Sequence, residues 1–409
     1  MQIKVRKVPI AVRGFRFAGV ACGLKASGKR DVALIVSDVP AAVAGAFTTN
    51  LVKGAPVTLS SERAAAGRAQ AILVNSGNAN AYTGRRGDEV ARHMCKVVSR
   101  QLGIADGLVL PSSTGRIGVQ LPKAVVTRGV MAACRALSPS SFYDALEGIM
   151  TTDAFPKFAA ESLVVDGAEI TIAGMAKGAG MIAPRMRLAV PHATMLCYLL
   201  TDARVSPAAL RQALGIGLQQ SFNCIVVDGD TSTSDTLLLL ANGAAGNAEI
   251  TPRSRAFPAF CGATGRIMES LARMVVKDGE GATKVIDVHV RRAATVRDAE
   301  RVADTVSRSP LCKAAFFGGD PYAGRIVCAA GYSGARFDPA RLDVHLNDVC
   351  IVRRGEEVIT PAVERKASAI VARPEFALTI DLHAGRAVAH RVCSDLTVDY
   401  VKFNSDYRT

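Results

Sequence analysis

The chain has 409 residues, of which 49% are hydrophobic and 21% charged, so it holds enough apolar material for one large core or two smaller ones. It contains no run of 18 or more apolar residues, which argues against a membrane span. The net charge of +14 comes from scattered basic residues, aromatic residues make up 5% and tryptophan is absent, so a nucleic-acid-binding surface lacks its usual parts.

The N-terminal segment is basic and rich in β-branched residues. The first thirty residues contain no acidic side chain, as in organelle transit peptides. Isoleucine and valine nevertheless recur through residues 3–12, and Pro9 would interrupt a presequence helix. We therefore predict an N-terminal strand over residues 3–12.

Strand-like and helical patterns alternate along the rest of the chain. The patterns typical of strands cover residues 32–36, 71–74, 169–172 and 284–290. The patterns typical of helices cover residues 88–102, 208–218 and 264–277. This alternation predicts a mixed α and β protein with polar loops at the ends of rigid elements.

An apolar run over residues 108–110 leads into Pro111-Ser112-Ser113-Thr114-Gly115. Gly115 allows a close approach of backbone, and Thr114 adds a hydroxyl group, so the segment is a candidate source of donors for a developing oxyanion. The alternative is an ordinary turn at the end of a strand.

A segment rich in glycine and proline occupies residues 174–192 and suggests a boundary near Ala193. Within it, residues 178–183 fit the dinucleotide-binding pattern G-x-G-x-x-A through Gly178 and Gly180, with Asp202 about twenty residues on. Pro184 argues against that alternative, because the pattern requires a helix to begin at these glycines.

Thr194 follows this segment and opens an apolar run. A threonine hydroxyl needs a neighbouring base, and an N-terminal threonine has one in its own α-amine. The same hydroxyl can attack the Ala193 carbonyl, convert the amide into an ester, and leave a new N-terminus after hydrolysis. The alternative is that Thr194 is a helix cap or the start of a strand.

The cysteines and histidines give no sign of a metal site. The ten cysteines contain no C-x-x-C pair, and the six histidines contain no H-E-x-x-H pair. In the absence of a secretory signal, we expect small, reduced cysteine side chains in a cytoplasmic protein.

Ten short motifs in a fixed order resemble the ornithine acetyltransferase family, the self-cleaving glutamate N-acetyltransferases of the cyclic arginine pathway. They lie at residues 14–34, 47–50, 75–80, 113–115, 151–153, 177–181, 193–196, 228–232, 280–284 and 404–409. Each motif alone is weak, but the resemblance spans nearly the whole chain.

The resemblance implies a layered α/β/β/α sandwich with mixed sheets, of the DmpA and ornithine acetyltransferase type. It implies cleavage between Ala193 and Thr194 into chains 1–193 and 194–409, which stay associated and pair into a heterotetramer. The reaction passes acetyl from N-acetylornithine to Thr194 and then to glutamate. No cofactor is needed, although acetyl-CoA is a possible second acetyl donor.

The resemblance also assigns roles to single residues. Thr114 and Gly115 would form the oxyanion hole. The substrate site would be lined by Thr151, Lys177, Thr194, Glu280, Asn404 and Thr409. Lys177 offers a cation for a carboxylate and Glu280 an anion for an amine. Without the family pattern, Lys177 would be a solvated loop lysine and Glu280 a helix cap.

Two segments depart from the family pattern. The family has about eleven residues between the lysine and the threonine, whereas 194 minus 177 gives 17 here, so about six residues within 185–192 are extra. This insertion leaves open an unprocessed, non-catalytic homologue. In the second departure, Tyr322-Ala323 stands where the family usually has Asn-Trp, which affects local packing more than catalysis.

Overall fold

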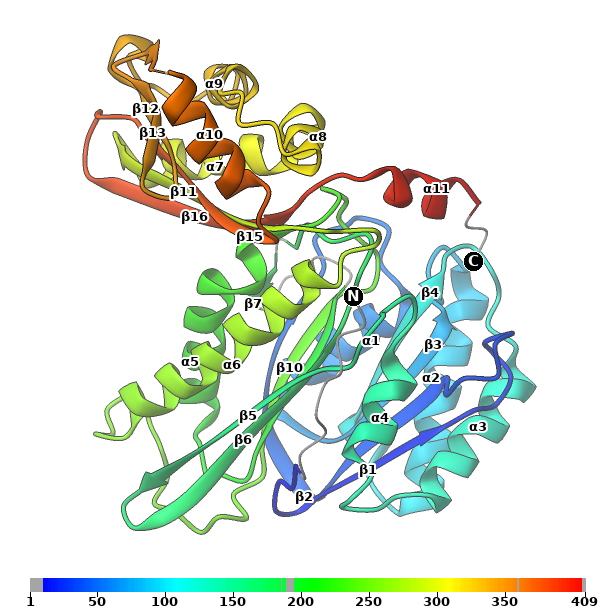
Figure 1. Cartoon of the computed structure of the whole chain (residues 1–409). Coiled ribbons are helices and arrows are strands. Elements are labelled where there is room, and N and C mark those ends of the chain that lie inside the picture. The colour runs from blue at the N-terminus through cyan, green and yellow to red at the C-terminus, as the bar shows by residue number, and fades with distance from the viewer. Residues whose placement is uncertain (1–9, 185, 189–194, 359, 407–409) are drawn as a thin grey trace. The chain divides into compact units, whose positions relative to one another are not determined.

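The computed structural model of the chain describes residues 10–184, 186–188, 195–358 and 360–406 (Figure 1). It divides into two compact units. The first contains the described residues up to Asn223 together with Asp230–Val275, and the second contains Cys224–Gly229 and the described residues from Val276 to Asp406. No helix among the described residues has the length and apolar character needed to cross a bilayer.

The described part of the first unit contains a mixed sheet of nine strands in the order β4-β3-β2-β10-β8-β6-β5, with β1 and β7 also paired to β2. The strands are β1 (Phe15–Val20), β2 (Val32–Phe47), β3 (Arg68–Asn78), β4 (Val109–Arg116), β5 (Lys157–Val165), β6 (Ala168–Lys177), β7 (Arg187–Leu188), β8 (Leu196–Thr201) and β10 (Thr236–Ala241). The pairs β3–β4 and β8–β10 are parallel, and the others are antiparallel.

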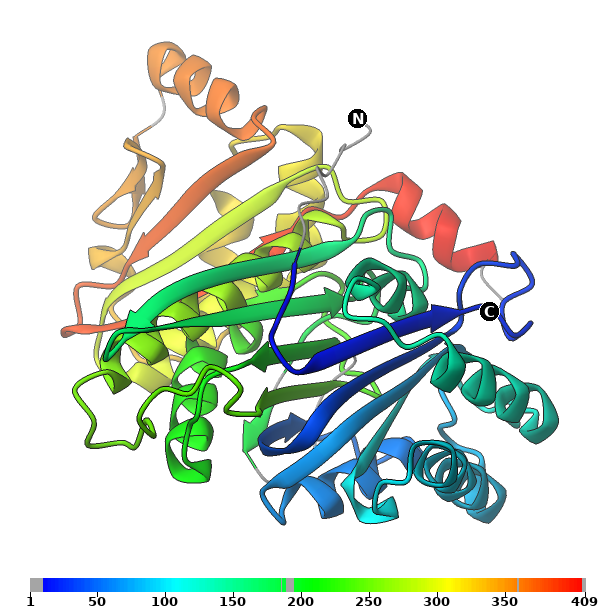
Figure 2. The same ribbon diagram turned by 90° about the horizontal axis from the view of Figure 1, so that it is seen from below.

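The long strand β2 pairs with different strands along its two halves. Its first half pairs with β1, which runs beside it in blue in Figure 2, and its second half pairs with β10. Its register against β3 shifts between Val36 and Ala41. Pro40 lies in this interval and has no N–H to donate, so the irregularity falls where the ladder loses a donor.

Helices cover the sheet of the first unit. They are α1 (Ala55–Ala64), α2 (Gly84–Leu102), α3 (Lys123–Arg135), α4 (Phe142–Ile149), α5 (Pro207–Gln220) and α6 (Phe257–Lys277), with short 3-10 turns at Asp106–Leu108 and Phe222–Cys224. Met94 of α2 and Val130 of α3 belong to one apolar cluster with Leu34 and Leu73 of the sheet. Phe142 of α4 belongs to a second cluster, so the central strands are buried by two separate sets of side chains.

The second unit contains a mixed sheet in the order β14-β13-β12-β15-β11-β16-β9. Its strands are β9 (Ile225–Val226), β11 (Val285–Ala293), β12 (Asp343–Leu346), β13 (Val349–Arg353), β14 (Glu356–Glu357), β15 (Glu375–Asp381) and β16 (Ala387–Ser394). Its helices are α7 (Val296–Arg308), α8 (Pro310–Gly318), α9 (Gly324–Gly331), α10 (Pro361–Val371) and α11 (Val398–Asp406), with a 3-10 turn at Pro339–Arg341. The amphipathic helix α7 packs its buried face, including Val302 and Val306, against β11 and β16.

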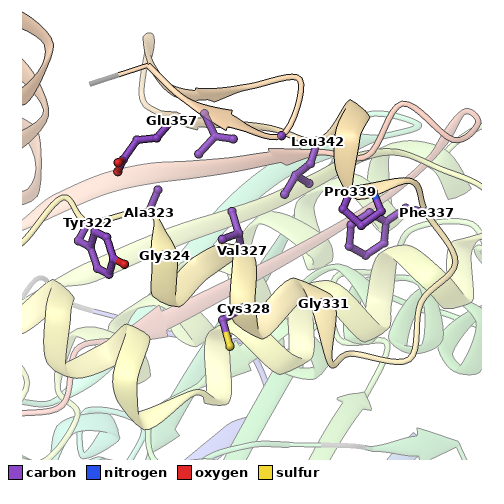
Figure 3. A pocket seen from close by; sticks show the side chains of 12 residues that line it. Tyr322, Ala323, Gly324, Val327, Cys328, Gly331, Phe337, Pro339, Leu342 and Glu357 are labelled. Carbon is purple, nitrogen blue, oxygen red and sulfur yellow. The ribbon is translucent and has the colours of Figure 1, made fainter. Parts of the chain in front are cut away.

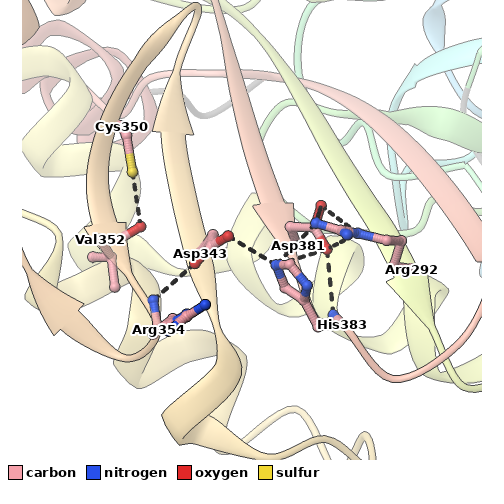
Figure 4. Close-up of polar contacts among 7 residues, drawn as sticks. All are labelled: Arg292, Asp343, Cys350, Val352, Arg354, Asp381 and His383. Carbon is pink, nitrogen blue, oxygen red and sulfur yellow. Dashed lines mark hydrogen bonds and ion pairs between the residues drawn. The ribbon is translucent and has the colours of Figure 1, made fainter.

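A polar cluster ties together three strands of this sheet (Figure 4). Arg292 at the end of β11 donates to Asp381 of β15 at 2.7 Å, and His383 lies 2.8 Å from the Asp343 carboxylate of β12. Asp343 also accepts from the Arg354 backbone N–H at 2.8 Å. These contacts hold the strand ends in register. The charged side chains of the cluster bond to one another within the sheet.

Most of the predicted elements are confirmed. Residues 32–36, 71–74 and 169–172 lie in β2, β3 and β6, residues 284–290 fall almost wholly in β11, and the three predicted helices lie in α2, α5 and α6. The mixed α/β class with mixed sheets is also confirmed.

Two predictions near the ends of elements are wrong in part. Residues 10–12 form no strand, and the rest of the predicted N-terminal strand lies outside the described residues. Residues 174–177 belong to β6 rather than to a loop. A methyl group on Gly174 would lie 2.7 Å from Leu271 of α6, so this glycine serves helix packing instead of chain reversal.

Candidate active site

Thr114 and Gly115 lie at the end of β4, where the strand pairs with β3. Gly115 has φ +127°, and a methyl group on it would stand 2.4 Å from the carbonyl carbon of Gly77. Gly77 itself has φ +95°. The predicted close approach of backbone at Gly115 is therefore confirmed, and the segment belongs to a strand rather than to an ordinary turn.

Buried polar side chains support this strand end. The Ser113 hydroxyl donates to Asn75 Oδ1 at 2.6 Å, and Asn75 Nδ2 donates to the Asn78 carbonyl at 2.8 Å. These bonds fix the strand ends beside Thr114 and Gly115 in a site from which water is largely excluded, where oriented donors are most effective.

Lys177 ends β6 and is 4% exposed, so it is not a solvated loop lysine. Its ammonium donates to Thr114 Oγ1 at 3.2 Å. Because the Thr114 oxygen accepts this bond, its own hydrogen is free to point at another acceptor. The structure thus brings together two predicted site residues that lie 63 positions apart.

Asp153 joins Thr151 to the Lys177 region. Its carboxylate accepts from the Thr151 backbone N–H at 2.8 Å, from the Gly178 N–H at 2.7 Å and from Lys157 Nζ at 2.6 Å. Burial alone would raise the pKa of Asp153, but the ammonium groups of Lys157 and Lys177 outweigh it and hold that pKa well below its ordinary value. Asp153 is therefore ionised at neutral pH and fixes Thr151 near Lys177.

The start of β8 lies beside Lys177. Leu196 pairs with Lys177 of β6 on one side and with Thr236 of β10 on the other. Leu196 is two residues after Thr194 in the sequence. Ala193, Thr194 and Thr409 lie outside the described residues, as does most of the extra segment at 185–192. The roles predicted for them remain predictions.

Asp235 is a candidate residue that the sequence reasoning missed. It is fully buried, and its two carboxylate oxygens have no hydrogen-bond partner in the described part of the chain. Burial raises the pKa of Asp235 well above its ordinary value, against the attraction of Lys177. The next residue, Thr236, donates its N–H to the Met195 carbonyl at 2.8 Å. An acidic residue two positions before the apolar run 237–241 was the signal that could have found it.

Glu280 and Asn404 come together in the second unit. Asn404 Nδ2, on α11, donates to Glu280 Oε2 at 3.1 Å. The Thr397 hydroxyl donates to the Gly281 carbonyl at 2.8 Å, and Asp395 accepts from the N–H groups of Thr283 and Lys284. Two motifs more than one hundred residues apart thus form one cluster.

The dinucleotide-binding alternative is wrong. No helix begins at Gly178 or Gly180, and residues 178–184 are irregular. The Gly178 N–H is already bonded to Asp153, so the segment lacks the helix N-terminus that would bind a pyrophosphate.

The described residues contain no cluster of three histidine, cysteine or acidic side chains arranged to hold a metal ion. The ten cysteines are free thiols, and five of them are buried.

At the second departure from the family pattern, a cavity of about 390 Å³ lies beside Ala323 (Figure 3). It is lined mainly by apolar side chains such as Val327 and Leu342 and contains none of the predicted site residues.

Comparison with known proteins gives a match to the ArgJ family over residues 16–409. The arginine biosynthesis bifunctional protein ArgJ of Symbiobacterium thermophilum is 49% identical over 401 residues, which cover 98% of each chain. The protein of the same name from Geobacter sulfurreducens is 45% identical over 97% of this chain and 100% of its own. Among solved structures, the ornithine acetyltransferase of Mycobacterium tuberculosis complexed with ornithine is 37% identical, with a TM-score of 0.40, and covers 43% of this chain and 94% of its own.

Proposed function

This chain belongs to the ArgJ family, and from that membership we propose that it transfers acetyl from N-acetylornithine to glutamate through an acetylated Thr194. The observation that carries the proposal is the contact between Lys177 at the end of β6 and Thr114, beside Gly115, at the end of β4, next to the start of β8. A role in arginine biosynthesis agrees with the names of relatives that match nearly the whole chain.

The proposed reaction begins with self-cleavage. Thr194 Oγ attacks the Ala193 carbonyl carbon, the C–N bond breaks as the C–O bond forms, and water hydrolyses the resulting ester. The freed α-amine, whose reference pKa is about 7.7 to 8.0, then accepts the hydroxyl proton when Oγ attacks N-acetylornithine. Ornithine leaves with that proton, and the glutamate amine takes the acetyl group from Thr194.

The oxyanion of each tetrahedral intermediate needs fixed donors. The Thr114 hydroxyl and the backbone at Gly115 supply them, and the Lys177 charge polarises the Thr114 hydroxyl through the 3.2 Å bond. Removal of one such donor typically lowers kcat by about 10²- to 10³-fold. No step requires a cofactor, and acetyl-CoA would enter as an alternative acetyl donor to the same threonine.

The proposal extends to assembly and location. Chains 1–193 and 194–409 would stay associated and pair as a heterotetramer, and the enzyme would act on small amino-acid substrates in the cytoplasm. The biosynthetic pathway in the names of the relatives supports the expected amino-acid substrates.

The variant Thr194→Ala tests the nucleophile. Because it lacks the attacking oxygen, we expect one intact chain and no acetyl transfer, whereas the native protein gives two pieces of roughly half the full mass. Intact-mass measurement reports the cleavage position and any acetyl adduct together. An uncleaved native chain without transfer would instead identify the unprocessed homologue that the extra segment at 185–192 allows.

A further inference from the structure

A cavity of about 780 Å³ in the first unit reaches Thr151, one of the residues expected to bind substrate. Its wall carries three basic residues, Lys25, Lys29 and Arg30. Lys25 Nζ donates at 2.7 Å to the carbonyl of Met150, the residue that directly precedes Thr151.

The acidic residues around this cavity already have ion-pair partners within the fold. Arg30 pairs with Asp144 and Glu147, each at 2.8 Å. Asp153 is held by Lys157 at 2.6 Å. Among the described residues, the ion pairs of these acids are therefore made with Arg30 and Lys157 and not with Lys25.

The ammonium group of Lys25 contacts carbonyl oxygens. Besides Met150, it bonds to the carbonyl of Arg30. Asp31 lies nearby, but its carboxylate accepts from the backbone N–H groups of residues 22–25. Within the part of the chain that the structure describes, two carbonyl contacts orient the ammonium, and its third N–H can donate to a ligand.

Lys25 also adjoins the expected reaction centre. A methyl group on Gly77 would lie 3.1 Å from Lys25 Cγ, and Gly77 is the residue against which Gly115 packs. Burial lowers the pKa of Lys25 to about 8; Asp31 and Asp153 oppose this shift, whereas Lys177 and Lys29 add to it. An anion placed here would therefore relieve repulsion between two neighbouring ammonium groups.

The two substrates of the proposed reaction differ in the charge at the end of their side chains. Each carries an α-carboxylate, for which Lys177 offers a cation, but ornithine ends in an ammonium group and glutamate in a second carboxylate. A site that accepts glutamate needs a second cation within reach of the first.

We propose that the cavity beside Thr151 receives the side-chain carboxylate of the acyl acceptor and that Lys25 is the residue that selects an acidic acceptor. This inference rests on the proposed function. It assigns to Lys25 the second half of the reaction and leaves the first half, in which N-acetylornithine acetylates Thr194, independent of it.

The variant Lys25→Gln tests the assignment because the amide keeps N–H donors for the two carbonyls and removes the charge. We expect kcat/KM for glutamate to fall about 10- to 100-fold, the range for loss of a charged hydrogen bond. Acetylation of Thr194 by N-acetylornithine should change by less than about threefold. The matched control is Lys96→Gln on the exposed face of α2, which should alter neither half-reaction.

Glutamine serves as a neutral acceptor that shares the reacting amine of glutamate. In the native enzyme the ratio of kcat/KM for glutamate to that for glutamine should decline above pH 8, because Lys25 loses its charge there. Lys25→Arg should keep a high ratio across that range, whereas Lys25→Gln should have a low ratio at every pH. The ratio is measured on acetylated enzyme, so it does not depend on yield or on the extent of cleavage.

An unchanged ratio in acetylated Lys25→Gln enzyme would overturn the assignment, as would equal losses in both half-reactions. Should native protein fail to become acetylated by N-acetylornithine, the proposed function itself would fall, and that result is distinct from a change of acceptor preference. If Lys25→Gln does not fold, native enzyme is compared with Lys25→Arg. The ratio of kcat/KM for glutamate to that for glutamine should then decline above pH 8 in the native enzyme and stay high in Lys25→Arg.

Discussion

Asp235 places an acidic side chain in a fully buried position without a hydrogen-bond partner in the described part of the chain. Burial raises its pKa in the folded state, with Lys177 opposing the shift. From about pH 4 up to that raised pKa, the folded chain therefore holds a proton that the unfolded chain has released. Unfolding releases this proton, so the free energy of unfolding falls as pH rises through that window.

The variant Asp235→Asn should remove this dependence. Between pH 5 and pH 7 the native side chain lowers the free energy of unfolding by at most about 2.7 kcal/mol, since one proton over one pH unit is worth about 1.36 kcal/mol. Urea unfolding of the uncleaved Thr194→Ala background measures this difference. The control Asp166→Asn changes an exposed turn residue with φ +48°, a conformation that asparagine tolerates. Parallel pH profiles for native and Asp235→Asn protein would contradict the expectation.

The sequence alone identified some of the candidate site residues and missed others. Thr114, Gly115 and Lys177 were found through motifs. The structure adds a hydrogen bond between Lys177 and Thr114, which are 63 positions apart, and no local pattern reveals it. Asp235 stands two positions before an apolar run and Lys25 lies within the motif at residues 14–34, but both were missed because neither pattern marks one side chain as functional. Their character comes from burial and from the approach of Lys177, which depend on tertiary packing.

Helix α11 and the loop that carries Glu280 are joined by one hydroxyl group. Thr397 accepts from the Tyr400 N–H at 3.1 Å, as an N-cap residue does, and donates to the Gly281 carbonyl at 2.8 Å. Gly281 has φ +67°, and a methyl group on it would stand 2.5 Å from the Tyr400 nitrogen. The loop and the helix therefore pack backbone against backbone.

The variant Thr397→Val keeps the shape and removes both hydrogen bonds. We expect about 1–2 kcal/mol less local stability for α11, seen as faster amide exchange over residues 398–406. Because Asn404 contacts Glu280 from this helix, KM for N-acetylornithine should also rise. Ser405→Ala on the same helix removes an exposed hydroxyl and should change neither quantity. Unaltered exchange in Thr397→Val would show that the cap does not hold the helix.

The elements themselves were largely predictable from periodicity. Helix α2 shows buried Val90, Met94 and Val98 at helical spacing, and β3 shows a continuous apolar run of a central strand. The end of β6 was not predictable, because Gly174 reads as a loop residue in isolation. Only the packing of α6, nearly one hundred residues later, explains a glycine within that strand.

The compact units of the whole molecule do not coincide with the proposed cleavage point. The first unit contains described residues on both sides of the proposed cut, up to Asn223, and then resumes at Asp230. Length and composition predicted one or two cores but could not show this arrangement, because the chain leaves the first unit and returns to it. The proposed chains 1–193 and 194–409 would therefore share one unit.

Association of the two fragments follows from the sheet of the first unit. Strand β8 lies after the proposed cut and pairs with β6, which lies before it; β10, also after the cut, pairs with β2. All six residues of β8 are buried, and full burial of one leucine side chain contributes about 1.5–3 kcal/mol.

Separation of the fragments would expose this strand and break both ladders, so we expect them to co-elute in size-exclusion chromatography. Because the contact is apolar, 1 M salt should not part them, whereas urea should. Elution of free fragments from native buffer would show that cleavage had disrupted the sheet.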